Sequence, residues 1–470
     1  MGNLLAAACY TSSSLCLVSQ TTADPYKLDS SAVQSPPKTL AGALRHVGPG
    51  LILAATVVGA GELVATTVLG AETGYILLWL ILLSCAVKVV VQHEIGRFTI
   101  GTGATTLEAL NKVPGPRMRV SWVVWLWLIM ASSLLFSTGG MLGAIAEVLH
   151  MVAPAVPIVF WVPAVSAVTF CLLYFGRYGL IEKASLVLVG TVTVMTVAGV
   201  FLLLKRPDLF SWTEVADGLR FQVPSGGLST ALMVFGATGV GAAELTSYPY
   251  WCIEKGYARF TGPYDGSEAW VQRAHGWVSV LRLDVILSFF VYTFATVAFF
   301  LLGAGVLHGL ETIPQGADTI RSLSMMYSET LGTWSLPLFL IGAVAVLYST
   351  ILALTAAYSR LIADFLGVAG FFDRTNYEQR TRFTQGAMLA FIIGPCITFY
   401  FIREPVVMLK VGGITQAILL PIIGFCTVYL LRRHLPQSIA PSRNLRLALW
   451  ATSSIMALVV LGAFYFQFSA

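Results

Sequence analysis

Residues 56–64, TVVGAGELV, place a glutamate beside two glycines inside apolar sequence long enough to cross a bilayer. An ionised carboxylate in the hydrocarbon core costs at least ~2.5–3.5 kcal/mol on insertion scales, so an intramembrane acid faces protein or water and marks a functional site. Glycine adopts the backbone angles at which a helix is interrupted. The segment therefore predicts a broken membrane helix with Glu62 at the break.

The same pattern occurs a second time in the chain. Residues 241–245, GAAEL, repeat residues 59–63, GAGEL, at four of five positions, with Glu244 in the place of Glu62 and with paired glycines at Gly239 and Gly241. Interrupted helices at corresponding positions of two halves are typical of inverted-repeat transporters, whose binding site lies near the bilayer midplane.

The composition places the whole chain in a membrane. Of its 470 residues, 57% are hydrophobic and 11% are charged, which predicts a multi-pass protein of the cell membrane surrounded by lipid bilayer. Seven cysteines are scattered without disulfide or metal-ligand spacing, and no nucleotide-binding glycine loop or nucleophile–base pair is present. We therefore expect no enzymatic activity, no cofactor and no nucleic-acid partner. The sequence does not indicate an oligomeric state.

The apolar segments predict eleven spans, and the basic residues predict their orientation. Of 28 lysines and arginines, 21 fall on the side of the N-terminus, five on the opposite side and two inside spans, which predicts a cytoplasmic N-terminus. Residues 1–46 are interpreted as a disordered tail and residues 47–470 as the transmembrane transporter domain. The predicted spans cover residues 49–70, 75–91, 120–148, 156–175, 180–204, 228–250, 278–306, 336–358, 383–402, 405–430 and 445–466.

The number of spans predicts the topology. Because five is odd, the second group of five spans crosses the membrane in the opposite sense to the first. Residues 48–204 and 228–432 then form two inverted repeats, each beginning with a broken helix, and residues 443–467 form one extra helix. The prediction is an all-α polytopic membrane protein with the leucine-transporter-like 5+5 inverted repeat plus one helix.

Several short motifs carry a resemblance to a known family. They are Gly48-Pro49, Gly74-Tyr75, Leu77-Leu78-Trp79, the spacing of Gln92, Arg97, Thr102 and Gly103, and Gly236-Ala237-Thr238. With these motifs the chain, over about residues 48–430, resembles the Nramp family of metal-ion transporters. The resemblance implies proton-linked uptake of divalent metal ions into the cytosol.

The chain departs from that family at the site itself. Where the family has Asp-Pro-Gly-Asn in its first span, residues 59–62 are Gly-Ala-Gly-Glu; where it has Met-Pro-His-Asn in its sixth, residues 240–243 are Val-Gly-Ala-Ala. These positions lack the thioether that favours transition metals. The third span, where the family has acids for its proton route, has only Glu147, at its outer end. The resemblance therefore implies the location of a metal site without its ligands.

Glu62 and Glu244 are the predicted metal ligands. Each would begin the second half of a broken helix, where the helix dipole favours an anion. Two carboxylates with freed carbonyls and water suit a hard cation such as Mg²⁺ or Mn²⁺. Without the ion, two facing acids would share a proton, which offers a coupling to protons, as in a symporter. The remaining residues of the predicted binding site are Gly59, Gly61, Gly239, Gly241, Thr238 and Gln416.

Four other polar residues are assigned to charge balance or a proton route. Lys410 would disfavour a divalent cation if it reached either glutamate, and would otherwise extend to the membrane interface. Lys88 is interpreted as an anchor at the inner interface, with a role as charge partner as the alternative. His93 and Glu94 are hypothesised to form a proton relay at the cytoplasmic exit.

Three functions fit these observations. The first is secondary transport of a hard divalent cation, with protons as the coupling ion. The second is a carrier of a small organic cation or an amino acid on the same fold, in which the glutamates bind an amine. The third is a scaffold that keeps the fold without transporting. For the two glutamates, the alternative is a structural role as hydrogen-bond acceptors.

Overall fold

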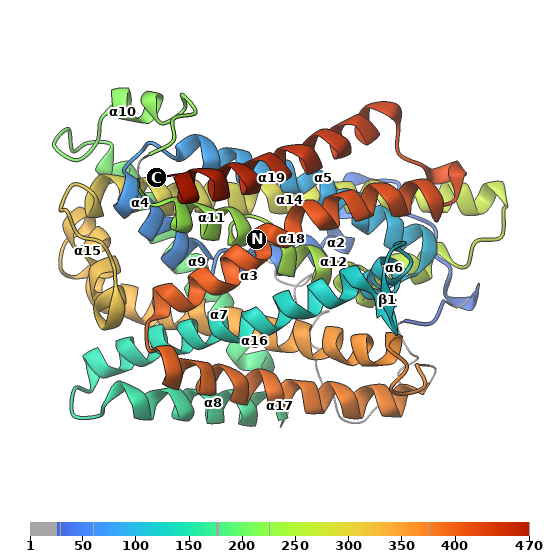
Figure 1. The fold of residues 1–470 in the computed structure, drawn as a ribbon, viewed down its shortest axis with the longest axis horizontal. Coiled ribbons are helices and arrows are strands. Elements are labelled where there is room, and N and C mark those ends of the chain that lie inside the picture. Colours follow the sequence, from blue (N-terminus) through green and yellow to red (C-terminus); the bar gives the residue numbers. More distant parts are fainter. Residues whose placement is uncertain are drawn as a thin grey trace.

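The structure is a computed structural model that describes residues 26–469 except 29, 60, 175–177, 225 and 375. The long helices run along the longest axis of the molecule (Figure 1). One end of the bundle carries α10 (Trp212–Asp217) and α15 (Thr319–Leu331), and the other carries α6 (Thr106–Asn111). We call these the α15 end and the α6 end. Residues 1–25 of the predicted tail lie outside the described residues.

The described residues confirm the predicted all-helical fold. Their only strands are a two-stranded antiparallel hairpin, β1 (Arg117–Met118) with β2 (Val120–Ser121). Among the described residues, eight helices are long and apolar enough to cross a membrane. Two more spans are the apolar helices α8 (Ile158–Tyr174) and α9 (Tyr178–Leu203), and the interrupted first span completes the eleven that the sequence predicts.

The first repeat is built from helices whose ends match the predicted spans to within a few residues, with the exception of the second span. Its elements before α8 are α2 (Leu40–His46), α3 (Pro49–Val57), η3 (Gly61–Thr66), α4 (Thr67–Thr73), α5 (Leu78–Thr102), α6 and α7 (Trp122–Val152). Helix α5 extends eleven residues past the predicted end of the second span at residue 91, so residues 92–102 are helical as well.

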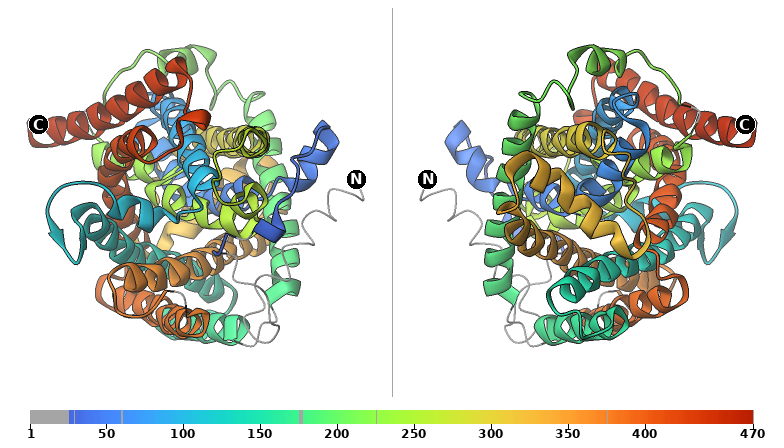
Figure 2. Two further views of the ribbon diagram at one scale, coloured as in Figure 1. Left: turned by 90° about the vertical axis from the view of Figure 1, so that its right-hand side faces the viewer. Right: turned by 90° about the vertical axis from the view of Figure 1, so that its left-hand side faces the viewer.

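The second repeat follows the same plan, beginning with a broken span. Seen along the helix axes, longer helices surround the segments of the two broken spans (Figure 2). The elements are α11 (Leu228–Ala237), α12 (Ala242–Lys255), α13 (Tyr257–Thr261), α14 (Glu268–Leu302), η4 (Gly303–Leu307), η5 (Gly316–Asp318), α15, α16 (Ser335–Val368), α17 (Tyr377–Ile402) and α18 (Pro405–Arg433), followed by η6 (Gln437–Ile439) and the extra helix α19 (Arg443–Ser469).

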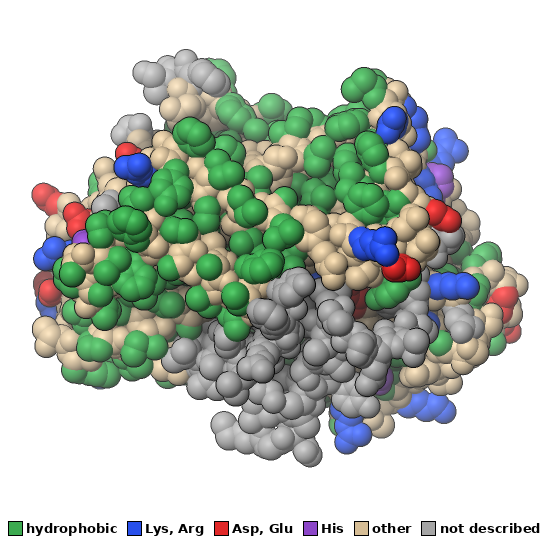
Figure 3. Space-filling view, turned by 90° about the horizontal axis from the view of Figure 1, so that it is seen from below, with side chains coloured by type: hydrophobic (Ala, Val, Ile, Leu, Met, Phe, Trp, Pro, Cys, Tyr) green, Lys and Arg blue, Asp and Glu red, His purple; other side chains and the backbone are tan. Residues whose placement is uncertain are grey.

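The surface has the charge distribution of a membrane protein. On the face shown in Figure 3, hydrophobic side chains cover the middle of the described part, and charged side chains gather toward the two ends. Large exposed apolar side chains lie on the outer helices, among them Phe290, Ile393 and Phe401. Such a surface is stable against lipid and not against water. The chain is therefore a multi-pass membrane protein.

Both helix breaks that the glycines predict are present. Helix α3 ends at Val57 and the chain continues as a π-helix, η3, from Gly61. Helix α11 ends at Ala237, and α12 begins at Ala242 after a non-helical segment. Of the four glycines expected to provide unusual backbone angles, only Gly239 has a positive φ, 60°.

The other glycines of the breaks are needed for close packing instead. A Cβ on Gly59 would lie 1.7 Å from Thr350 Oγ1. A Cβ on Gly241 would lie 2.5 Å from Gln416 Oε1 and 2.6 Å from Glu244 Oε2. Gly241 has a φ of −70°, so the expected unusual backbone angle is not found there. A Cβ on Gly61 would lie 3.2 Å from Ala237 O, so this glycine also leaves room for a neighbouring group.

A second close approach joins the broken sixth span to the tenth. A Cβ on Gly236 would lie 1.8 Å from the carbonyl oxygen of Gly413, and a Cβ on Gly413 would lie 2.7 Å from Met233 O. Small residues let two membrane helices approach until their backbones are in contact. Helices α11 and α18 therefore pack backbone to backbone next to the break.

Part of the segment that the composition assigns to a disordered tail is ordered. Residues 26–46 contain a 3₁₀ turn at Ser30–Ala32 and helix α2, which Thr39 caps by accepting from Gly42 N at 3.1 Å. The segment binds the α6 end of the bundle, where Trp277 Nε1 donates to Gln34 O at 3.1 Å and Tyr26 Oη donates to Glu254 Oε1 at 3.1 Å.

An acid that the sequence analysis did not single out holds the start of the first span. Asp284 on α14 is fully buried and accepts hydrogen bonds from Gly48 N at 2.8 Å, Gly50 N at 2.6 Å and Tyr248 Oη at 2.9 Å. The first amides of a helix have no partner within the helix. Asp284 therefore acts as the N-cap of α3 from a different helix.

Replacing Asp284 with alanine removes the acceptor of two buried amides. We expect the free energy of unfolding to fall by about 2 kcal/mol, the upper part of the range for loss of a helix N-cap, measured as a lower midpoint of thermal unfolding in detergent. The matched control is Asp217→Ala, because Asp217 pairs with Arg220 in an exposed contact of 2.9 Å and contributes little. Equal midpoints in both variants would contradict this role.

Candidate functional site

Glu62 lies on η3 at the first break and reaches the second. Its side chain is fully buried, and Oε1 accepts from Thr296 Oγ1 of α14 at 2.6 Å and from Gly239 N at 3.4 Å. Gly239 belongs to the segment between α11 and α12, so the carboxylate of one repeat binds a freed amide of the other. The other oxygen, Oε2, is buried and has no hydrogen-bond partner among the described residues.

Glu244 lies in the first turn of α12, directly after the second break. Its Oε2 is also buried without a partner among the described residues. A small cavity of ≈ 40 Å³ opens beside it, and Glu244, Gln416, Thr56 and Gly61 are among its lining residues. Water occupies about 30 Å³ in the liquid. The cavity therefore has room for about one water molecule or one ion.

Gln416 on α18 is positioned by the backbone of the break. Its Oε1 accepts from Ala243 N at 3.0 Å, one of the unpaired amides at the start of α12. A Cβ on Gly241 would lie 2.5 Å from this oxygen and 2.6 Å from Glu244 Oε2, so both oxygens lie next to Gly241. Two oxygen atoms from different helices thus converge at one point of the cavity.

Two buried carboxylate oxygens without a partner are unusual, because buried polar atoms normally have hydrogen-bond partners. Glu244 lines the cavity, whereas Glu62 does not, although its neighbour Gly61 does. Each needs either a proton or a cation. The described residues contain no cluster of three or more His, Cys, Asp or Glu side chains that could hold a metal. Any metal here would therefore be bound by the two glutamates together with amide and carbonyl oxygens and water.

The cavity also contains groups that the sequence analysis missed. Met141 on α7 and Met233 on α11 line it, so thioethers are present although the family's motif positions lack one. Thr296 donates to Glu62 from the last two turns of α14. No signal in the sequence pointed to these residues, because a single methionine or threonine in an apolar span is not distinctive.

Lys88 is not an interfacial anchor, and that interpretation is wrong. Its side chain is fully buried, and Nζ donates to the carbonyl oxygens of Phe235 and, at 2.7 Å, Thr238 at the end of α11. The predicted second span stopped at residue 91, which put Lys88 one turn from its end. Because α5 continues to Thr102, Lys88 lies well inside the helix and beside the break.

Lys410 does not contact the predicted ligands. Its Nζ lies 3.5 Å from Glu72 Oε1 at the end of α4. The condition under which Lys410 would weaken the site, contact with either glutamate, is therefore not met in this structure. Thr238 uses its hydroxyl on its own helix, donating to Val234 O at 2.8 Å, and offers the site only its carbonyl, which Lys88 binds.

His93 and Glu94 belong to a separate cluster on α5. Glu94 is buried between His93 Nδ1 at 2.7 Å and Arg97 Nε at 3.1 Å. The structure does not connect this cluster to Glu62 or Glu244 by any hydrogen bond among the described residues, and a proton relay there stays a prediction. Glu147 on α7 accepts from Ile320 N at 2.7 Å and Arg321 N at 3.3 Å, which ties it to the start of α15.

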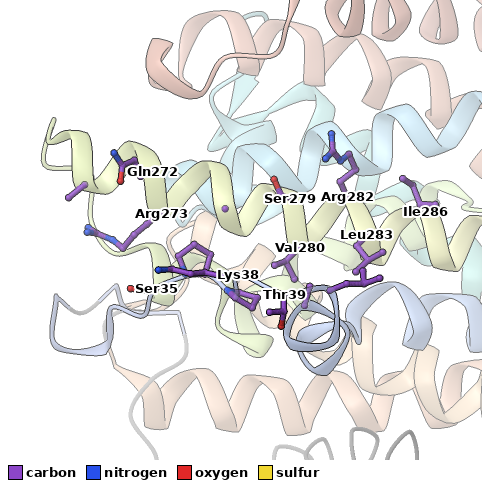
Figure 4. A pocket seen from close by; sticks show the side chains of 16 residues that line it. Ser35, Lys38, Thr39, Gln272, Arg273, Ser279, Val280, Arg282, Leu283 and Ile286 are labelled. Atoms are coloured by element: carbon purple, nitrogen blue, oxygen red, sulfur yellow. The ribbon is translucent and has the colours of Figure 1, made fainter.

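A much larger cavity lies away from the breaks. It measures ≈ 900 Å³ at the α6 end, between residues 35–43 and the first half of α14, and its lining includes Lys38, Arg273 and Arg282 (Figure 4). None of the predicted site residues lines it. The size of a cavity therefore does not locate the site, which follows from the buried acids.

Asp364 on α16 joins four segments at the α6 end. One oxygen accepts from Arg374 Nη2 at 2.7 Å and Arg380 Nη2 at 2.8 Å, and the other from Thr105 Oγ1 and Tyr250 Oη, both at 2.7 Å. Both oxygens of this buried carboxylate are therefore satisfied, and two arginines share one of them. This network holds α6, α12, α16 and α17 together at the α6 end of the bundle.

Asp364→Ala should destabilise the protein strongly, because it leaves two arginines without their shared acceptor. We expect a loss of about 3–5 kcal/mol of unfolding free energy, as for one partner of a buried ion pair. The control is Glu378→Ala on α17, which removes an exposed pair with Arg382 at 2.6 Å. Thermal unfolding of the two variants in the same detergent checks this, and a midpoint for Asp364→Ala no lower than that of the control would contradict it.

Comparisons with known proteins agree with this architecture. A crystal structure of the Eremococcus coleocola manganese transporter with a bound aromatic bis-isothiourea compound has a TM-score of 0.61 at 17% identity, covering 93% of this chain and 90% of that one. An inward-facing structure of Mhp1 has a TM-score of 0.54 at 14% identity, covering 96% and 95%. The chain therefore has the leucine-transporter-like fold, which is a fold of membrane transporters.

The sequence comparisons identify the family. The family described as natural resistance-associated macrophage protein-like, Nramp, matches residues 50–465, so this chain belongs to the Nramp family. The divalent metal cation transporter MntH of Staphylococcus saprophyticus is 32% identical over 211 residues, which are 41% of this chain and 42% of that protein. An uncharacterized protein of Pasteurella multocida is 23% identical over 390 residues, 82% of this chain and 84% of that protein.

Proposed function

We propose that this protein is a secondary transporter that carries a metal cation through the cavity between the two broken helices. The observation that carries the proposal is the pair of buried carboxylate oxygens, on Glu62 and Glu244, that have no protein partner among the described residues. Both belong to helix breaks of symmetry-related spans. A cation would supply what each oxygen lacks.

Family membership supports a metal ion as the substrate. A manganese transporter shares the fold, and MntH, which is described as a divalent metal cation transporter, is related in sequence. The groups at the site are mainly oxygens, from two carboxylates, one amide and backbone carbonyls, which suit a hard ion such as Mg²⁺ or Mn²⁺. The nearby thioethers of Met141 and Met233 leave Mn²⁺ as the better match of the two.

The size of the cavity favours an ion over the main alternative. Pockets for drug-sized organic ligands measure roughly 300–1,000 Å³, and the cavity at the breaks measures ≈ 40 Å³. Lys88 and the glutamates would otherwise suit a zwitterion. A cavity of this size supports an ion more than an amino acid as the substrate.

Coupling to protons and the orientation in the membrane complete the proposal. Two acids close to each other interact, so an empty site would hold a proton that the entering cation releases. The excess of basic residues on one side of the spans supports a cytoplasmic N-terminus, and we propose the cell membrane as the location. The transport direction proposed is into the cytosol.

Glu62→Gln and Glu244→Gln should each lower Mn²⁺ uptake into proteoliposomes at least about tenfold, because each removes one unit of charge from the cation's site and a tenfold change corresponds to 1.4 kcal/mol. Glu72→Gln is the matched control on the same broken span, since Glu72 pairs with Lys410. Size-exclusion profiles verify that all three variants fold. Undiminished uptake in both site variants would place the site elsewhere, and absence of uptake of any metal by the wild-type protein would favour the scaffold.

A further inference from the structure

The end of α11 presents carbonyl groups that its own helix cannot satisfy. The last carbonyls of a helix have no partner within it, and the helix dipole adds partial negative charge at this end. The chain then leaves the helix between Thr238 and Gly241 before α12 begins. In a soluble protein water would bind these oxygens, whereas inside a membrane the protein itself or an ion has to do so.

Lys88 meets this need from a different helix. Its ammonium group donates to the carbonyl oxygens of both Phe235 and Thr238 and lies 5.0 Å from the centre of the Phe235 ring. Ser84, one turn earlier on α5, lies 3.4 Å from the same Phe235 carbonyl and 3.4 Å from Thr238 Oγ1. Oxygen atoms around a positive charge and an aromatic face beside it are the surroundings of a bound cation.

The lysine is directed at the backbone and not at an acid. The ion pairs within 4.0 Å among the described residues do not include Lys88, although Glu62 and Glu244 belong to the same region. A buried lysine is costly unless its charge is compensated, and it usually pairs with a carboxylate. The carbonyl end of α11 is therefore its main counter-charge.

We propose that Lys88 is a tethered cation that fills a cation-binding site formed by the carbonyls of Phe235 and Thr238, and that an alkali or divalent metal cation binds there once the lysine is removed. The site differs from the cavity of Glu244 and Gln416, which Lys88 does not line. The proposal does not depend on Glu62 and Glu244 carrying the substrate. According to this proposal, the ammonium group of Lys88 neutralises the carbonyl end of α11, as a bound metal ion would.

Such a fixed charge has two consequences for transport. The end of α11 is neutralised permanently, so the break stays in place without a second bound ion. The ammonium also adds positive charge near the two glutamates, which lowers their attraction for a divalent cation. Loss of Lys88 should therefore create a dependence on added cations and raise affinity for Mn²⁺ at the same time.

The test measures thermal unfolding of purified wild-type, Lys88→Met and Lys88→Gln proteins in N-methylglucamine chloride, then with NaCl, KCl, MgCl₂ or MnCl₂ at constant ionic strength. We expect Lys88→Met to unfold at a lower temperature than wild type and to recover when at least one metal cation is added. The wild-type midpoint should not change with Na⁺ or K⁺. Lys410→Met is the control, because Lys410 pairs with Glu72 away from the break.

The glutamine variant keeps the proposal testable if methionine at position 88 prevents folding. Glutamine can donate neutral N–H groups to the same carbonyls but brings no charge, so cation-dependent recovery is expected there too. A variant that folds and shows no response to any of the four cations would overturn the proposal. Cation-dependent recovery in Lys410→Met as well would also overturn it, since the effect would then not be specific to the break.

The outcome is separable from that of the transport assay. Recovery of Lys88→Met by cations, combined with no metal uptake by the wild-type protein, would support the tethered cation and contradict metal transport. Uptake by the wild-type protein without any cation response in either Lys88 variant would support metal transport and reject the tethered cation.

Discussion

Hydrocarbon offers no hydrogen bonds, so every amide and carbonyl freed by a broken membrane helix has to be satisfied from within the protein. The centre of this molecule is organised around that constraint. Glu62 of η3 takes the Gly239 amide, Gln416 of α18 takes the Ala243 amide, and Lys88 of α5 takes carbonyls at the end of α11. Three helices thus supply the second break with charged or polar groups, and one of these groups, Gln416, also lines the cavity beside Glu244.

The sequence was sufficient for the fold because the apolar spans and the two glycine-flanked acids are local signals. It was less informative about the site. The polar residues from Gln92 to Arg97 ended the predicted second span too early, since their burial against other helices cannot be seen in one segment. The same limit hid Thr296 and Asp284, which lie on α14 and act on residues more than 200 positions away. Long-range partners of this kind follow only from the packed structure.

Membership in the Nramp family and departure from its motifs have to be understood together. The fold and the two breaks are kept, whereas the residues at the breaks, including the positions of the acids, are different. With both glutamates ionised and Lys88 protonated, these three side chains carry a net charge of −1, less than two carboxylates alone would provide. If the breaks hold a cation as proposed, this charge is a more specific clue to the substrate than the family name.

The backbone contact between Gly236 of α11 and Gly413 of α18 constrains how such a site could open. The two backbones are so close that a Cβ on either glycine would overlap the other helix. Helices packed this closely would clash if one slid along the other, so α11 would move with α18 as one rigid body. The flexible joint is then the short segment from Thr238 to Gly241, which lies between this body and α12. Exposure of the cavity to one side of the membrane and then to the other would then require a rotation about this one glycine-containing hinge. The hydrogen bonds from Lys88 to Phe235 and Thr238 would change with the angle of that rotation.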